Sequence, residues 1–165
     1  NNEDINEIIP HLFVSNWVTS NNPEIMEKYN IKAVITLETT PKPFNIVNYY
    51  DLNSIDHMYI YLQDIPTANI YRYFDGSFNF IKSHIKYHEN VLVHCAAGVS
   101  RSVTIVLNYM IRNIFETQFV RGQNADDIIN YVLYVARMKR PFINPNSGFL
   151  KQLSDKTNEY IYNVY

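Results

Sequence analysis

The sequence predicts an α/β fold whose central sheet is mainly parallel. Short apolar runs rich in β-branched residues, typical of buried strands, alternate with amphipathic segments whose apolar residues recur every three or four positions, typical of helices. Residues 33–37 and 91–93 are such runs, and residues 69–86 form the clearest helical segment. Strands interleaved with helices favour a parallel sheet, because each helical crossover returns the chain to the same end of the sheet.

Length and composition indicate one globular domain over residues 1–165. No linker, repeat or low-complexity tract divides the chain. Apolar residues make up 47% of the sequence and charged residues 18%, but no apolar run approaches the roughly 20 residues that span a bilayer, so we expect no membrane span. A net charge of -2, without clustered Lys or Arg, argues against nucleic acid as a partner.

The first third of the chain predicts two strands and a short helix. Pro10 places the first strand at the edge of the sheet, because proline cannot donate a hydrogen bond to a neighbouring strand. Pro23 fits the first turn of the helix, and two later prolines break the chain before the next element. The strands are expected over residues 8–14 and 33–37, and the helix over residues 24–29.

The middle of the chain predicts two strands, each followed by a loop and a helix. Pro66 forbids a regular continuation of the first strand, so Asp64 lies just past a strand end. The second strand leads through a turn of small residues into a helix, an order that binds anions at the helix N-terminus. The expected ranges are strand 58–62, helix 69–86, strand 91–93 and helix 102–114.

Two further helices are expected in the last third, over residues 126–138 and 148–161. Between them lies a turn that contains two prolines and Asn146. Asparagine is a preferred N-cap residue, so Asn146 is expected to begin the last helix.

A cysteine and an arginine flank the small-residue turn, with five residues between them. If this turn wraps around a phosphate, its backbone N–H groups point inward as a nest, and the following helix adds the positive end of its dipole. Gly98 permits backbone conformations that branched residues resist, and the planar fork of Arg101 can hold two phosphate oxygens. The expected phosphate-binding residues are Ala96, Ala97, Gly98, Val99, Ser100 and Arg101.

The same positive field favours the thiolate form of Cys95, which makes this residue the expected nucleophile. Attack on phosphorus would displace an alcohol or phenol and leave a phosphocysteine that water must hydrolyse. Ser102 is expected to donate a hydrogen bond to the departing sulfur in the second step. His94 is expected to hold the loop through a hydrogen bond from its ring.

Asp64 is the expected general acid, which protonates the leaving oxygen and later activates water. It follows a strand, lies on a loop limited by proline, and would emerge at the same sheet edge as the cysteine. Asp56 and Asp75 are the alternatives, although Asp75 lies within the predicted helix and is better explained as a solvated residue. Asn69 and Asn146 are candidates for orienting the acid loop and the cradle, respectively, but turn or cap duty explains them equally well.

The segment 93–102, with the sequence Val-His-Cys-Ala-Ala-Gly-Val-Ser-Arg-Ser, resembles the signature loop of the dual-specificity protein phosphatases. The likeness is closest to the small atypical members and extends to residues 9–15, 64–70 and 140–149. This resemblance implies the cysteine-phosphatase fold, a five-stranded sheet flanked by helices. It also implies a shallow pocket for phosphotyrosine and phosphoserine or phosphothreonine on proteins, with neither metal nor cofactor.

Two stretches depart from the family pattern. Residues 108–111 (Asn-Tyr-Met-Ile) replace a common Ala-Tyr-Leu-Met, and residues 115–124 resemble an insertion of about ten residues. Neither stretch touches the expected catalytic positions. We therefore expect them to affect substrate choice or regulation and not the reaction type.

Other functions remain open from the sequence alone. The same chemistry could act on a phosphoinositide or an RNA 5' phosphate, although such substrates would favour basic residues in the loop. A rhodanese-type sulfurtransferase also uses a cysteine in a helix-capping loop, but it needs neither Asp64 nor Ser102. A phosphoprotein-binding scaffold without activity is the alternative from a different class.

Cys95 is the only cysteine, so no intrachain disulfide can form and a multi-cysteine zinc site is excluded. The histidines show no metal-ligand spacing with cysteine or acid. A reducing compartment is the better expectation, and we place the protein in the cytoplasm, with the nucleus as a further location.

Overall fold

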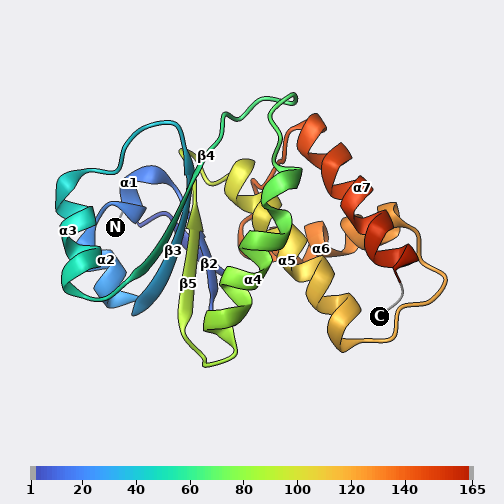
Figure 1. Cartoon of the computed structure of the whole chain (residues 1–165), viewed down its shortest axis with the longest axis horizontal. Helices are drawn as coiled ribbons and strands as arrows, with labels where there is room; N and C mark the ends of the chain where they lie inside the picture. The colour runs from blue at the N-terminus through green and yellow to red at the C-terminus, as the bar shows by residue number, and fades with distance from the viewer. Residues whose placement is uncertain (1–2, 164–165) are drawn as a thin grey trace.

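Five strands form one mixed sheet in the computed structural model, which describes residues 3–163 (Figure 1). The strand order is β1-β2-β5-β3-β4, in which β1 is antiparallel to β2 and all other neighbours are parallel. The expected mainly parallel, five-stranded sheet is therefore confirmed. The strands are β1 (Ile5–Ile9), β2 (Leu12–Ser15), β3 (Ile31–Glu38), β4 (Asp56–Tyr61) and β5 (Asn90–His94).

Helices cover both faces of the sheet, as Figure 1 shows. One face carries α1 (Trp17–Ser20), α2 (Pro23–Lys28) and α3 (Phe44–Leu52). The other carries α4 (Phe74–Ile85), which follows a short 3-10 helix, η1 (Tyr71–Tyr73), together with α5 (Arg101–Thr117), α6 (Ala125–Lys139) and α7 (Ser147–Tyr162). Each layer of helices buries its own apolar cluster against the sheet, and each fully buried Ile, Leu or Phe contributes about 1.5–3 kcal/mol.

The carboxyl ends of the parallel strands all lie at the same end of the sheet. Thr36 of β3 is level with His94 of β5, and Glu38 is level with Tyr61 of β4. Cys95 directly follows β5, and Asp64 follows β4 after two intervening residues. Both expected catalytic residues therefore follow the carboxyl ends of strands. Open α/β sheets bind their ligands at this end.

Three sequence expectations about elements need correction. Residues 8–14 do not form one strand: the chain turns at Pro10 and His11, whose φ of 72° is left-handed, and separates β1 from β2. Helix α3 was not expected after the prolines. The helix expected over residues 69–86 begins as η1 and becomes α-helical only at Phe74.

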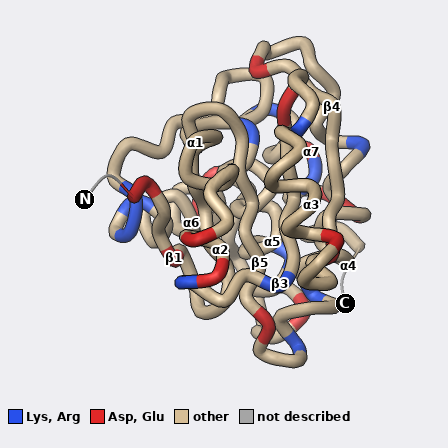
Figure 2. Tube along the Cα trace, turned by 90° about the vertical axis from the view of Figure 1, so that its left-hand side faces the viewer, with Lys and Arg blue, Asp and Glu red and all other residues tan. Residues whose placement is uncertain are grey.

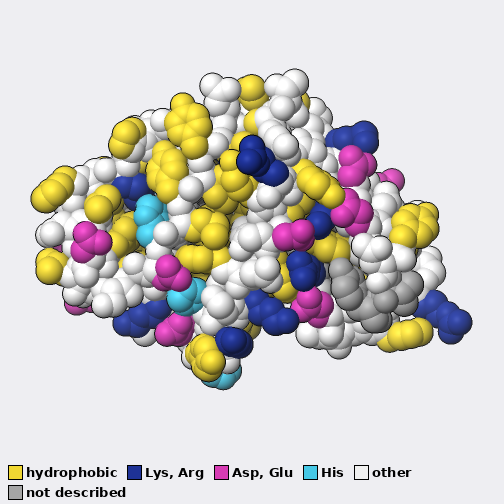
Figure 3. All heavy atoms as spheres, in the orientation of Figure 1, with side chains coloured by type: hydrophobic (Ala, Val, Ile, Leu, Met, Phe, Trp, Pro, Cys, Tyr) yellow, Lys and Arg dark blue, Asp and Glu magenta, His cyan; other side chains and the backbone are white. Residues whose placement is uncertain are grey.

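Acidic and basic residues are interspersed along the chain, as Figure 2 shows. Figure 3 shows exposed hydrophobic side chains over α3 and β4. The exposed apolar residues of these two elements include Phe44, Leu52, Tyr59 and Tyr61. Within residues 3–163, no helix has the length and apolar character needed to cross a membrane.

Candidate active site

The carbonyl oxygens of the loop between β5 and α5 accept hydrogen bonds from other segments or from the first turn of α5. The carbonyl of Ala96 accepts a hydrogen bond from the backbone N–H of Trp17 at 2.9 Å, and that of Val99 accepts from Asn144 N–H at 2.9 Å. The carbonyl of Ser100 accepts from the Thr104 N–H within α5, also at 2.9 Å. A trans peptide points its C=O and the next N–H in opposite directions. The N–H groups that follow these carbonyls therefore face the interior of the loop.

Arg140 holds the two remaining carbonyls of the loop. Its Nε donates to the Gly98 carbonyl at 2.8 Å and its Nη2 to the Ala97 carbonyl at 3.2 Å, while Asp4 and Asn6 accept from the same guanidinium. The arginine is completely buried. Such burial is tolerated because carbonyl, amide and carboxylate oxygens satisfy its donors.

Gly98 is the position of the loop that requires glycine. Its φ is 68°, and a Cβ there would lie 2.5 Å from Nη2 of Arg140 and 2.7 Å from the Ser15 carbonyl oxygen. Any other residue would push the guanidinium or β2 away from the loop. The sequence expectation that Gly98 supplies backbone freedom agrees with this conformation.

Cys95 lies at the base of the loop and is 2% exposed. Its Sγ is 3.2 Å from the hydroxyl oxygen of Ser102, on the first turn of α5. A thiolate there accepts a hydrogen bond from that hydroxyl. The two residues that the sequence assigned to attack and to sulfur departure are thus in direct contact.

Arg101 begins α5 and its side chain turns back toward the strand ends. Its Nη1 donates to Glu38 at 3.2 Å and to the Leu62 carbonyl at 3.0 Å, and both charged side chains are almost fully buried. Its Nε is buried and has no hydrogen-bond partner among residues 3–163. A buried guanidinium donor is costly to leave unpaired, so an acceptor such as a phosphate oxygen fits this position.

His94, the last residue of β5, is fully buried in a polar network behind the loop. Its Nδ1 lies 3.1 Å from Ser20 Oγ and 3.3 Å from the Cys95 carbonyl oxygen, and its Nε2 lies 2.8 Å from Thr36 Oγ1 and 2.9 Å from Lys42 Nζ. Burial, with the nearby Lys42 charge, holds the pKa of His94 well below its ordinary value. The ring is therefore neutral and contacts the backbone of Cys95, as expected for a residue that holds the loop.

Asp64 lies on the exposed loop after β4, where Asn146 holds it. The Nδ2 of Asn146 donates to Asp64 Oδ1 at 2.9 Å, its Oδ1 caps α7, and its backbone N–H donates to Ser100 Oγ at 2.9 Å. Asn146 thus contacts both the expected acid and the expected phosphate-binding loop. Asn69 lies elsewhere: its Oδ1 accepts from the Arg72 N–H at 3.2 Å, which is turn duty.

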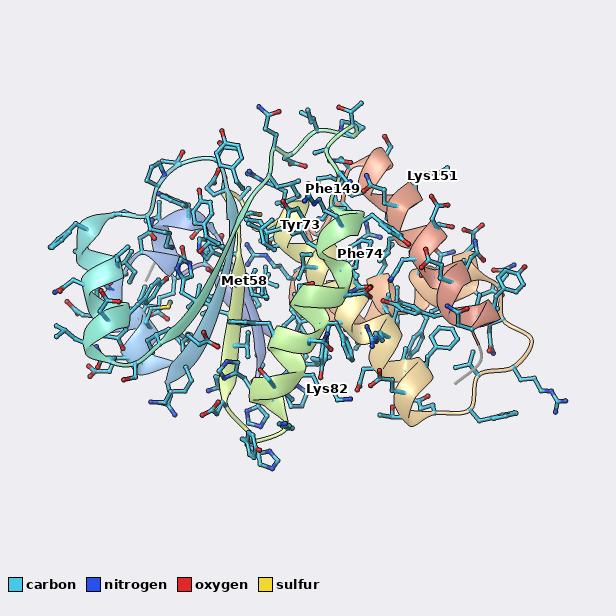
Figure 4. All side chains as sticks on the ribbon, viewed as in Figure 1. Met58, Tyr73, Phe74, Lys82, Phe149 and Lys151 are labelled. Atoms are coloured by element: carbon cyan, nitrogen blue, oxygen red, sulfur yellow. The ribbon has the colours of Figure 1, made fainter. Side chains whose placement is uncertain are left out.

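The N-terminal part of helix α7 packs against the loop that carries Asp64, which we call the acid loop. A Cβ on Gly148 would overlap the carbonyl group of Pro66, so only glycine allows this approach. Gln152 donates from Nε2 to the Ala68 carbonyl at 2.9 Å, one turn farther along. Figure 4 shows Phe149 at the start of α7, which packs on η1.

The alternative acids face other partners. Asp56 is the first residue of β4, so it lies at the end of the sheet opposite Cys95, and it pairs with His84 at 2.8 Å. Asp75 lies on α4 and pairs with Lys156 at 2.9 Å. Neither carboxylate lies beside the phosphate-binding loop. Within residues 3–163, no group of three or more His, Cys, Asp or Glu side chains is arranged to hold a metal ion.

Sequence reasoning missed four residues of the site: Glu38, Lys42, Arg140 and Gly148. Each acts through a contact with a segment far away in the chain, which no local pattern indicates. The available local signals were a carboxylate at the end of a buried strand and a glycine two residues after an N-cap.

The comparisons with known proteins agree with this geometry. The family described as dual specificity phosphatase, catalytic domain, matches residues 12–159. Dual specificity protein phosphatase 22 of Xenopus tropicalis is 32% identical over 96% of this chain and 67% of its own length. Dual specificity protein phosphatase MPK-4 of Drosophila melanogaster is 33% identical over 90% of this chain and 35% of its own length.

A solved structure shares the fold. The crystal structure of DUSP15 superposes with a TM-score of 0.77 at 26% identity, covering 98% of this chain and 95% of that one. The chain spans from about one third to about two thirds of the length of the curated relatives named above. The family match, the fold and the loop between β5 and α5 lead to one conclusion: the chain belongs to the dual-specificity phosphatase family, as a catalytic domain that resembles its small atypical members.

Proposed function

We propose that this chain hydrolyses phosphate monoesters on tyrosine and on serine or threonine side chains of proteins, through a phosphocysteine intermediate. The observation that carries the proposal is the loop between β5 and α5, in which the carbonyls of residues 96–100 are all hydrogen-bonded, which leaves the amides that follow them directed toward the interior of the loop. Residues 1–165 act as one catalytic domain in this proposal, without metal or cofactor. A cytoplasmic location remains a prediction.

In the first step, the Cys95 thiolate attacks phosphorus and the bond from phosphorus to the substrate oxygen breaks. The inward amides of residues 96–101 and the free Nε of Arg101 stabilise the charge on the equatorial oxygens. Asp64 in its acid form donates a proton to the leaving oxygen, so the substrate side chain departs as a neutral alcohol or phenol.

In the second step, water attacks the phosphocysteine and gives its proton to the Asp64 carboxylate. The P–S bond breaks, and the sulfur leaves as a thiolate. Ser102 stabilises that thiolate, because its hydroxyl is within hydrogen-bond distance of Sγ. Inorganic phosphate then leaves, and both catalytic groups return to their starting protonation states.

Two substitutions test the assignment, measured with phosphotyrosine and phosphothreonine peptides. Cys95→Ser is expected to abolish turnover and to retain binding of inorganic phosphate. Asp64→Asn is expected to lower kcat by about 10²–10⁴-fold and to remove the alkaline limb of the pH profile, because the acid form no longer exists. Asp51→Asn, an exposed change on α3, is the control. Appreciable turnover by the Cys95 variant would refute the nucleophile.

The same assay separates the competing functions. A phosphoinositide and an RNA 5' triphosphate are offered beside the peptides, and faster turnover of either would redirect the proposal. The loop favours peptides, since the side chains of Ala96, Ala97, Val99 and Ser100 carry no charge. Phosphopeptide binding without any turnover would indicate the scaffold alternative.

A further inference from the structure

Lys42 is a partly buried cation that the proposed reaction does not use. It lies in the loop between β3 and α3, and its Nζ donates to Asn21 Oδ1 at 2.6 Å. The same ammonium lies 2.9 Å from Nε2 of His94, the residue that precedes Cys95. It is thus linked through a single side chain to the backbone of the nucleophile.

Desolvation of Lys42 disfavours its charge. Its Nζ lies over the rings of Trp17 and Tyr50, 5.0 Å and 5.8 Å from their centres, and this cation–π attraction offsets part of that cost. Burial lowers the pKa of Lys42 to about 7, and Glu38, which acts in the opposite direction, is paired with Arg101 instead. A lysine held at such cost is better explained by a role in the site than by stability.

The hydrogen bonds around His94 define its tautomer. The Ser20 hydroxyl donates to the Trp17 carbonyl at 2.7 Å, so Ser20 Oγ can only accept from Nδ1 of His94. The Cys95 carbonyl, also near Nδ1, can likewise only accept. Nδ1 therefore carries the proton, and Nε2 is the acceptor that needs a donor. Lys42 supplies that donor, while Thr36 Oγ1 lies between Nε2 and His57 and contacts both rings.

We propose that Lys42 is a positioning residue for the reaction: its ammonium selects the Nδ1-protonated tautomer of His94, which in turn fixes the backbone of Cys95 beneath the phosphate. Without Lys42, and with the Thr36 hydroxyl donating to Nε2 of His57, Nε2 of His94 can take the proton and donate to Thr36. An unprotonated Nδ1 would then face the Cys95 carbonyl, and this contact is repulsive. The inference rests on the proposed use of Cys95 as the nucleophile.

Lys42→Met tests the proposal, with Lys32→Met as the matched control, because Lys32 is exposed near the other end of β3. For 4-nitrophenyl phosphate at about pH 6, we expect kcat to fall about tenfold and KM to change less than about twofold, as for one lost hydrogen bond to a charged group. The melting temperature should change little, because the removal of a desolvated charge offsets the acceptors that methionine leaves unpaired on Asn21 and His94. A purely structural lysine would instead lower stability and leave kcat in place.

Two further readouts do not depend on turnover. Nitrogen NMR of the His94 ring should show protonated Nδ1 in the wild type and in Lys32→Met, and a shift toward protonated Nε2 in Lys42→Met. Adding Ser20→Ala to Lys42→Met should cost less than the sum of the single changes, since both act on one tautomer. An unchanged tautomer together with an unchanged kcat would overturn the inference. Inactive wild-type protein would refute the proposed function, and the NMR result would still decide the role of Lys42.

Discussion

Individual residues from distant parts of the chain determine the shape of the proposed phosphate-binding loop, residues 95–101. Trp17 and Asn144 hold carbonyls with their backbone amides, and Arg140 holds two more with one side chain. The inward amides are therefore oriented before a phosphate arrives, which is the arrangement that stabilises transition-state charge without reorganisation. Arg140 is the member of this set whose contribution a side-chain substitution can measure.

Arg140→Lys keeps the charge, but one ammonium cannot reach the Ala97 and Gly98 carbonyls and Asp4 at once. We expect the inhibition constant of inorganic phosphate and the KM of an aryl phosphate to rise about tenfold, since each unmade buried hydrogen bond costs about 1–3 kcal/mol. Competitive inhibition measures the first quantity. Lys139→Arg, at the exposed preceding position, is the control. Unchanged phosphate inhibition in a folded Arg140 variant would contradict this role.

At the scale of elements, the acid loop depends on α7. The N-terminal turn of this helix meets the Pro66 carbonyl at Gly148, and its N-cap Asn146 bonds to Asp64. The cap, the close approach and the acid thus share one helix end. A displacement of the loop should affect proton transfer before it affects phosphate binding, because the phosphate is held by other elements.

Gly148→Ala tests this separation. We expect a fall in kcat of about tenfold or more for phenyl phosphate, a poor leaving group that needs the acid, and a smaller fall for 4-nitrophenyl phosphate, which needs it less. Gly76→Ala is the matched control, because a Cβ there meets open space and should only favour α4. Equal losses on both substrates would contradict a role through the acid.

Elements defined by local patterns were predicted, and those defined by tertiary contacts were not. Helix α3 was missed because it buries only Ile46 and Tyr50, one four-residue step, directly after two prolines. The first strand was drawn through Pro10, although the left-handed His11 makes a turn there. Residues 115–124, read as an insertion, complete α5 at Thr117 and then form a loop.

The same contrast holds within the site. Cys95, Ser102 and the loop residues follow from the sequence because strand, turn and helix are contiguous. The roles of Glu38, Lys42 and Arg140 depend on how β3, its following loop and the end of α6 meet that turn. The length of α5 also explains why the residues after Thr117 lie far from the loop between β5 and α5, since a helix of 17 residues is about 25 Å long.

At the scale of the whole molecule, the two ends of the parallel strands contribute differently to function and to stability. The carboxyl ends of β3, β4 and β5 carry the proposed catalytic groups. At the opposite end of the strands, His84 near the end of α4 bonds to Asp56 at 2.8 Å and to Glu89 at 2.7 Å. These two bonds join the helix to the start of β4 and to the residue before β5. The contacts of His84 at this end of the sheet should therefore influence the free energy of unfolding without influencing catalysis.

His84→Gln tests that division through pH. Burial opposes the charge of His84, but hydrogen bonds to Asp56 and Glu89 outweigh it and raise the pKa of His84 above 6.5. The stabilisation is fully present below the unfolded value and is lost as pH rises through the raised folded value. Urea unfolding should therefore show the variant less stable by about 0.5–1 kcal/mol near pH 5.5, with a smaller difference near pH 8.5. The variant's kcat should match the wild type at both pH values, because the proposed catalytic residues lie at the other end of the sheet. A stability difference that is constant with pH would instead mean that His84 acts by packing and not by charge.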